Sequence, residues 1–124
     1  MLSTSAIDLN VRSYGQDLGE HRHAFVQLVL PLSGAISLDI AGQEGALAPG
    51  RAAFIGAGVR HSQVGEGPNR SLILDLDQAE MSESDNLFER LTSRPFVSLS
   101  PAASKLIDFM GLQVAHGGVA APTL

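Results

Sequence analysis

The chain has no cysteine among its 124 residues, so it forms no disulfide, no thiolate metal site and no cysteine nucleophile. Basic residues are also scarce, with 8 Lys and Arg against 13 Asp and Glu, and they form no run. This scarcity argues against binding of a nucleic-acid backbone or of an anionic membrane surface. No apolar run is long enough to span a membrane, and residues 1–10 show no secretory signal. Together these absences favour the cytoplasm.

The composition that remains is that of one folded domain. Hydrophobic residues make up 44% of the chain and charged residues 17%, which separates it from disordered sequences. A chain of this length fits one domain and leaves little room for a second. Because cysteine is absent, a metal site would have to use histidine, carboxylate or amide ligands.

Residues 6–77 have the pattern of short strands separated by turns that contain glycine or proline. Several short strands at this spacing are typical of a sandwich or a barrel. We expect strands at residues 6–14, 24–32, 35–40, 46–48, 51–55, 61–64 and 71–77. The second of these is apolar on both sides, which predicts that both of its faces are covered.

The pattern changes after Asp77, where helical periodicity replaces alternation. We expect a first helix at residues 83–91, capped by Ser82, and a second at residues 101–112, capped by Ser100. Residues 114–124 are rich in glycine, alanine and proline, and we expect a frayed tail there. The expected apolar stripes are Leu87, Phe88 and Leu91 in the first helix, and Leu106, Ile107 and Met110 in the second.

Three histidines and one glutamine form the candidate chemical site. His21, His23 and Gln27 are separated by even steps, so an extended strand would direct all three to one face. Six residues of straight strand span about 20 Å, which is far wider than a metal site. A bend must therefore lie between His21 and Gln27 if all three hold one ion. His61, which follows a glycine-rich turn, is the candidate for the third imidazole.

This ligand set would be electrically neutral. Three imidazoles and an amide oxygen suit a borderline divalent ion such as Zn, Ni, Fe, Mn or Cu, and leave room for water or a ligand. An ion held in this way keeps its full positive charge, which favours an anionic ligand. The alternative is that these histidines are structural residues held by hydrogen bonds.

The spacing of these residues resembles the two motifs of the cupin superfamily. Gly15, His21, His23, Gln27 and Gly34 stand at the intervals of the first motif, with Gln27 where glutamate is usual. Gly50, Gly58 and His61 stand at the intervals of the second motif, with Gly56 where proline is usual and Gly65 where asparagine is usual. The resemblance implies a single mainly β jelly-roll barrel with one or two short C-terminal helices. It also implies that His21, His23, Gln27 and His61 are metal ligands.

A narrower resemblance is to the sensor domain of AraC-type transcriptional regulators. It rests on residues 21–34, 47–55, 59–61 and 69–76, and residues 87–91 and 94–96 resemble the linker helices of that family. The family's helix-turn-helix region is not seen, so the chain is either part of a regulator or a stand-alone relative. The expected organisation is a barrel at residues 1–80, a helical extension at 81–113 and a tail at 114–124. The resemblance and the apolar stripes imply a small-molecule ligand in the barrel and a homodimer.

Three functions remain open at this point. The first is a ligand-sensing and dimerisation domain of a regulator. The second is a small metal-dependent cupin enzyme of the dioxygenase or isomerase type, for which an acid/base partner near the ion is missing. The alternation directs Asp39, Asp75 and Asp77 outward and leaves no catalytic residue to assign. The third is a binding barrel without a metal.

Overall fold

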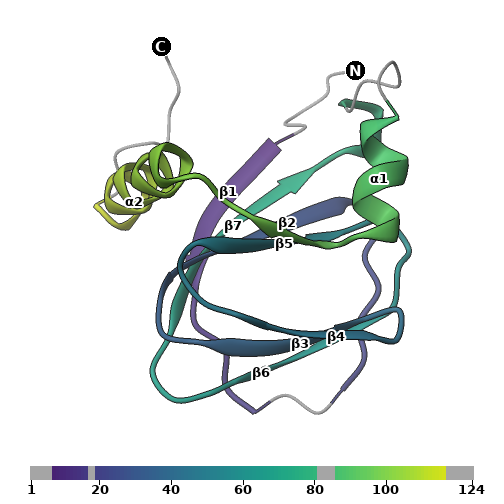
Figure 1. Cartoon of the computed structure of the whole chain (residues 1–124), viewed down its shortest axis with the longest axis horizontal. Helices are drawn as coiled ribbons and strands as arrows, with labels where there is room; N and C mark the ends of the chain where they lie inside the picture. Colours follow the sequence, from purple (N-terminus) through teal and green to yellow (C-terminus); the bar gives the residue numbers. More distant parts are fainter. Residues whose placement is uncertain (1–6, 17–18, 81–85, 117–124) are drawn as a thin grey trace.

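Two antiparallel sheets face each other in the computed structural model, which describes residues 7–16, 19–80 and 86–116 (Figure 1). The larger sheet has the order β1 (Ile7–Arg12), β7 (Arg70–Leu76), β2 (Val26–Ser33), β5 (Arg51–Ile55) and β8 (Phe96–Ser98). The smaller sheet has the order β4 (Gln43–Leu47), β3 (Ile36–Ile40) and β6 (His61–Gly65). A 3₁₀ turn (Gln78–Glu80) and two helices, α1 (Leu87–Ser93) and α2 (Pro101–Ala115), complete the described chain. This is the mainly β barrel with C-terminal helices that the sequence predicts.

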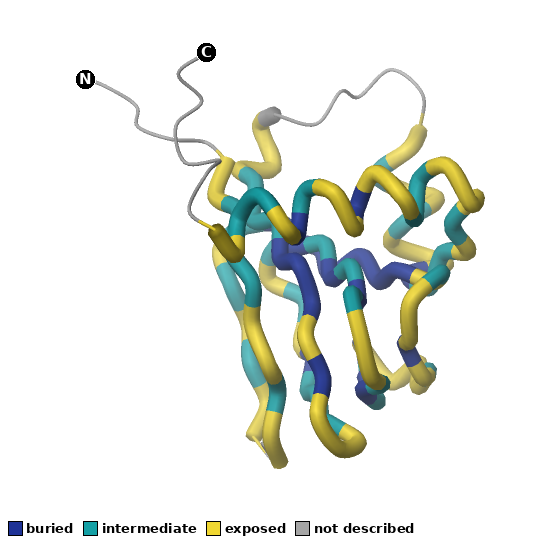
Figure 2. Tube along the Cα trace, turned by 90° about the vertical axis from the view of Figure 1, so that its left-hand side faces the viewer, coloured by how far each residue is buried: buried dark blue, intermediate teal, exposed yellow. Residues whose placement is uncertain are grey.

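The hydrophobic core lies between the two sheets. Alternate residues of β3 point inward and are buried, as the alternation of Ile36, Leu38 and Ile40 predicts. The larger sheet meets them with inward residues of β2, β5 and β7. Burial in Figure 2 is accordingly concentrated on the strands. The core cluster consists of Val29, Ile36, Leu38, Ile40, Leu47, Ala53, Ile55 and Ile73.

Both helices lie on the outer face of the larger sheet (Figure 1). α2 contacts β1, β2 and β7, and a Cβ atom on its Gly111 would lie 2.7 Å from the Leu32 side chain. α1 contacts β5, where Phe88 packs edge-on against Phe54 at 5.8 Å between ring centroids. β2 is therefore covered on both faces, as its two-sided apolar pattern predicts. In the described part of the chain no helix is long and apolar enough to cross a membrane.

The second helix begins where the sequence predicts. Ser100 caps it, with its Oγ accepting a hydrogen bond from the backbone nitrogen of Ala103 at 3.1 Å. The helix continues to Ala115, three residues beyond the predicted end and into the expected tail. The predicted stripe is partly wrong: Ile107 is buried against the barrel, but Leu106 is 58% exposed on the other side.

The region before α2 differs from the prediction in two ways. The first helix begins at Leu87, after Asn86, and the predicted cap Ser82 lies outside the described residues. Phe96 lies in strand β8, paired with Ala53 of β5, and is not part of a linker helix. Pro95 favours an extended residue before it and cannot continue a helix, which explains the strand. The segment after Asp77 therefore adds a strand to the barrel as well as helices.

Candidate functional site

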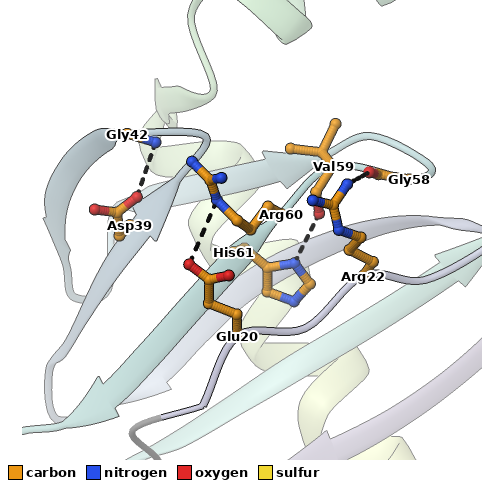
Figure 3. Close-up of polar contacts among 8 residues, drawn as sticks. All are labelled: Glu20, Arg22, Asp39, Gly42, Gly58, Val59, Arg60 and His61. Atoms are coloured by element: carbon orange, nitrogen blue, oxygen red, sulfur yellow. Dashed lines mark hydrogen bonds and ion pairs between the residues drawn. The ribbon is translucent and has the colours of Figure 1, made fainter.

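A short backbone bridge brings His21 against His61. The amide of His21 donates to the carbonyl of His61 at 2.8 Å, and the amide of His61 donates back at 3.0 Å. An ion pair between Glu20 and Arg60, 3.5 Å apart, flanks this bridge (Figure 3). Residues far apart in sequence thus become direct cross-strand neighbours.

A second set of contacts ties the same loop to the turn at Gly58. The amide of Gly58 donates to the carbonyl of His23 at 2.7 Å, and the Arg22 guanidinium donates to the carbonyl of Gly58 at 3.4 Å (Figure 3). Gly58 has a φ of +78°, which a glycine adopts without strain. The glycine at this motif position therefore allows the turn to hold both histidine loops together.

The chain bends between His23 and Gln27, as the sequence analysis requires. Ala24 and Phe25 form the bend, and β2 starts only at Val26. The Phe25 ring stacks on the His23 ring at 4.7 Å and 4°. Ring centroids of His23 and His61 are 4.8 Å apart, and those of His21 and His61 are 5.8 Å apart. The fold thus gathers all three predicted imidazoles.

Gln27 is the second residue of β2, and its side chain is held by the carboxylate of Asp75. It is 3% exposed, and its Nε2 donates to Oδ1 of Asp75 at 2.9 Å. An ionised carboxylate only accepts hydrogen bonds, so this contact fixes the amide with its nitrogen toward Asp75. The Oε1 of Gln27 is then the atom left for a ligand or an ion.

The inward position of Asp75 corrects the sequence analysis. Asp75 pairs with Gln27 across β7 and β2, so the two side chains share the inner face. The prediction failed because Leu72, Leu74 and Leu76 were taken as core-facing. These leucines face the outer side of the sheet, where α2 packs on β7. A helix can cover an apolar row on the outer face just as the opposite sheet covers one on the inner face. Asp39 alternates with the buried residues of β3 and lies on the outer face, whereas Asp77 is exposed after the end of β7.

The histidines and Gln27 line a cavity of about 310 Å³ inside the barrel mouth. The four predicted residues all contribute to it. Sequence reasoning missed Arg12, Tyr14 and Gln63. The signal for Arg12 was its alternation with Asp8 and Asn10, which puts a polar row on the inner face of β1. The lining residues are Arg12, Ser13, Tyr14, Gly15, His21, His23, Gln27, His61 and Gln63.

Asn69 positions the Tyr14 wall of the cavity. Its side-chain oxygen accepts from the Tyr14 amide, and its Nδ2 donates to the Tyr14 carbonyl, both at 2.9 Å. A Cβ atom added to Gly65 would lie 2.6 Å from this Nδ2. Asn69 thus occupies the space beside the position where the second cupin motif usually has asparagine, which accounts for glycine at residue 65.

Burial keeps two of the imidazoles neutral. It lowers the pKa of His61, with the neighbouring His23 and His21 acting in the same direction. It also lowers the pKa of His23, against the opposing charge of Asp75. His61 Nδ1 lies 3.2 Å from the Val59 carbonyl, which can only accept, so Nδ1 carries the proton and Nε2 has the lone pair. Neutral imidazoles with a fixed tautomer are the form that binds metal.

The imidazole and amide donors of this cavity suit a metal ion, but the described histidine and carboxylate side chains alone are not grouped closely enough to hold one. Within the described part of the chain, His23 Nδ1 is buried and has no hydrogen-bond partner, and a bound ion would satisfy this nitrogen. Among residues 7–16, 19–80 and 86–116, however, no three histidine or carboxylate side chains are grouped closely enough to hold an ion. Gln27, an amide, would have to take part.

The lowered histidine pKa values predict that acid weakens the fold. Unfolded histidines titrate near pH 6.5, so below that pH the unfolded chain binds protons that folded His23 and His61 resist. The stability that neutral burial provides is complete above about pH 7 and decreases as the pH falls through 6.5. We expect the free energy of unfolding, measured by urea titration, to fall between pH 7.5 and 5.5. The fall should be smaller in His61→Asn and unchanged in His116→Ala, and a flat profile in the parent chain would refute the argument.

Comparison with known proteins identifies the fold. No protein-family model matches the chain, and no curated protein matches it in sequence. A cupin superfamily protein from Desulfitobacterium hafniense aligns with a TM-score of 0.54 and 19% identity, over 62% of this chain and 72% of that one. A cupin-2 domain protein from Shewanella frigidimarina aligns with a TM-score of 0.53 and 16% identity, over 60% and 74%. An RmlC-like cupin from the same organism has a TM-score of 0.53 and 14% identity, over 66% and 72%. The chain therefore has the cupin jelly-roll fold, with His21, His23, Gln27 and His61 in the barrel cavity.

Proposed function

We propose that this chain is the ligand-sensing and dimerisation domain of an AraC-type transcriptional regulator, acting in the cytoplasm. One observation carries the proposal. α2 packs on the outer face of β1, β2 and β7. On the inner face of this sheet, Arg12 and Gln27 line the cavity and Asp75 holds Gln27. A ligand that shifts these strands changes the surface on which α2 rests. Such coupling needs a ligand with different affinities for two arrangements of the helix.

We also propose that the cavity holds a divalent metal ion through His21, His23, Gln27 and His61. Two observations on the histidines support this: burial favours the neutral form of His23 and His61, and Nδ1 of His23 has no hydrogen-bond partner among the described residues. A third is that the bond from Gln27 Nε2 to Asp75 leaves the Gln27 oxygen available to an ion. A bound ion would polarise an oxygen of the ligand and lower the pKa of a bound water. Zn, Ni, Fe, Mn and Cu all accept this donor set.

In the dimer that we propose, α2 of one chain packs against α2 of the other. Leu106, Phe109 and Leu112 are 58%, 57% and 57% exposed and lie three residues apart, so they form one ridge. The opposite side of the helix, with Ile107 and Gly111, is already buried on the barrel. A second copy presents the same ridge, and a two-fold pairing covers both at once. The exposed side of α2 is visible in Figure 2.

We expect Leu106→Ser combined with Phe109→Ser to convert the dimer to a monomer without unfolding the barrel. The two side chains lie outside the core, so their loss removes only the apolar area buried between copies. Light scattering after size exclusion measures the mass over a range of concentrations. Asp108→Ser, an exposed change on the same helix, is the matched control and should stay dimeric. A parent chain that is monomeric at every concentration would contradict the dimer.

A second candidate function is a small metal-dependent cupin enzyme. The observation in its favour is Asp75, whose carboxylate contacts Gln27 at the cavity and supplies the acid/base group that the sequence analysis found missing. Because the Asp75 carboxylate already accepts a hydrogen bond from the Gln27 amide, it is better suited to positioning Gln27 than to proton transfer. For this reason we rank sensing first. Chemical alteration of a bound small molecule by metal-loaded protein, lost in Asp75→Asn, would reverse the ranking.

A further inference from the structure

The part of the cavity lining at the end of β1 and just after it offers two hydrogen-bond donors, Arg12 and Tyr14. Arg12 uses its Nε on the Asn10 oxygen at 3.3 Å, and Asn10 in turn donates to Asp8 at 3.0 Å. No carboxylate of the described residues lies within ion-pair distance of the Arg12 guanidinium. Arg12 is an exposed residue that lines the cavity, and its positive charge forms no ion pair with a carboxylate of the described residues.

Tyr14 adds a second donor beside this guanidinium. The Arg12 guanidinium acts on the Tyr14 hydroxyl through its charge and through hydrogen bonding. A hydroxyl whose oxygen faces a guanidinium keeps its own proton for another acceptor. The Tyr14 ring packs against the core, and Asn69 holds its backbone on both sides. Burial raises the pKa of Tyr14, which keeps the hydroxyl protonated. The phenol is thus a fixed donor.

Two other residues of the lining, Gln27 and His61, present acceptors. The Oε1 of Gln27 and the lone pair of His61 Nε2 are acceptors, because their partners on Asp75 and Val59 fix the other ends of both groups. The cavity lining therefore has donors at Arg12 and Tyr14 and acceptors at Gln27 and His61. A guanidinium with an adjacent hydroxyl donor is well suited to a carboxylate, which takes one hydrogen bond on each oxygen.

If the cavity is the small-molecule site proposed above, we infer that its ligand is a small organic acid whose carboxylate binds Arg12 and Tyr14. In the metal-free chain the rest of the molecule then lies toward His23, His61 and Gln27, where a hydroxyl group matches the acceptors of Gln27 and His61. The volume of about 310 Å³ is at the low end for ligand cavities and selects small acids over large ones. The Asp75 carboxylate does not line the cavity, although its charge acts on Tyr14 and His23. Its bond to Gln27 turns the amide nitrogen away from the cavity and toward the carboxylate.

The test uses glycolate, a small hydroxy acid, and glycolamide, its neutral amide of nearly the same shape. Each is titrated into the full chain while the Arg12 Nε–H and Tyr14 ring resonances are followed by NMR. We expect glycolate to bind at least about tenfold more tightly than glycolamide, since the carboxylate forms charge-assisted hydrogen bonds. Arg12→Gln should remove this preference, Tyr14→Phe should reduce it, and the exposed Arg70→Gln, outside the cavity, should keep it.

Each remaining outcome has a separate meaning. Equal binding of the two probes at the cavity would overturn the carboxylate assignment and leave the small-molecule site intact. Glycolate preference that survives in Arg12→Gln would also overturn it. Failure of both probes to shift any cavity resonance at about 100 mM, far above the millimolar range of weak binding, would contradict this inference and the proposed ligand site together.

Discussion

Gly65→Ala should destabilise the fold by about 2–3 kcal/mol, the usual cost of forcing extra atoms into a well-packed region. A Cβ atom at residue 65 would lie 2.1 Å from the Tyr14 carbonyl oxygen and 2.6 Å from the Asn69 side-chain nitrogen. The first contact is with backbone, which cannot swing aside. The chain at Tyr14, two residues after the end of β1, must move, and with it the hydrogen bonds from Asn69 and the part of the cavity lining that Tyr14 forms.

Gly15→Ala is the matched control for this effect. Gly15 accepts a hydrogen bond from the Gly65 amide at 2.9 Å, so it lies in the same contact, yet a Cβ atom there meets nothing within 4 Å. Neither glycine has a positive φ, so the comparison isolates the clash. Urea unfolding should separate the two variants clearly. A Gly65→Ala chain within about 0.5 kcal/mol of the parent, the range of neutral surface changes, would show that this packing is not needed.

The strands of the barrel were predictable because their side chains alternate. The pattern at residues 51–55 gives β5 with its observed bounds, and β3 and β6 differ by one residue each. β4 was predicted too short, since Gln43 and Glu44 are polar and were taken as part of the turn. β8 was missed because three residues beside a proline carry almost no periodic signal.

The sequence predicted which four residues form the candidate site, but not the side chains that surround and orient them. Motif spacing named His21, His23, Gln27 and His61, and all four line the cavity. Asp75 was assigned to the wrong face because its neighbours form an apolar row, and sequence alone does not show that helices cover the outer face. Tyr14 depends on Asn69, 55 residues away, and no local pattern reports such a contact.

His61→Ala should reduce the affinity of the chain for Zn²⁺ by at least about 100-fold, since it removes a proposed ligand and not only a supporting contact. His61 is 3% exposed, so His61→Asn serves as a second variant that keeps more of the buried volume. His23→Ala should have a similar effect, because its buried Nδ1 has no other partner. His116, exposed at the end of α2, lies outside the cavity and its replacement by alanine should change nothing.

The most direct test of the metal-competent cavity is therefore calorimetric titration of Zn²⁺ into the chelator-treated parent chain and these variants. We predict about one ion per chain for the parent and for His116→Ala, in line with a single site of four protein ligands. We predict loss of that binding in His23→Ala, His61→Ala and His61→Asn, with the fold retained by circular dichroism. Binding that is absent in the parent, or that survives undiminished in folded His23→Ala and His61→Asn, would contradict the site.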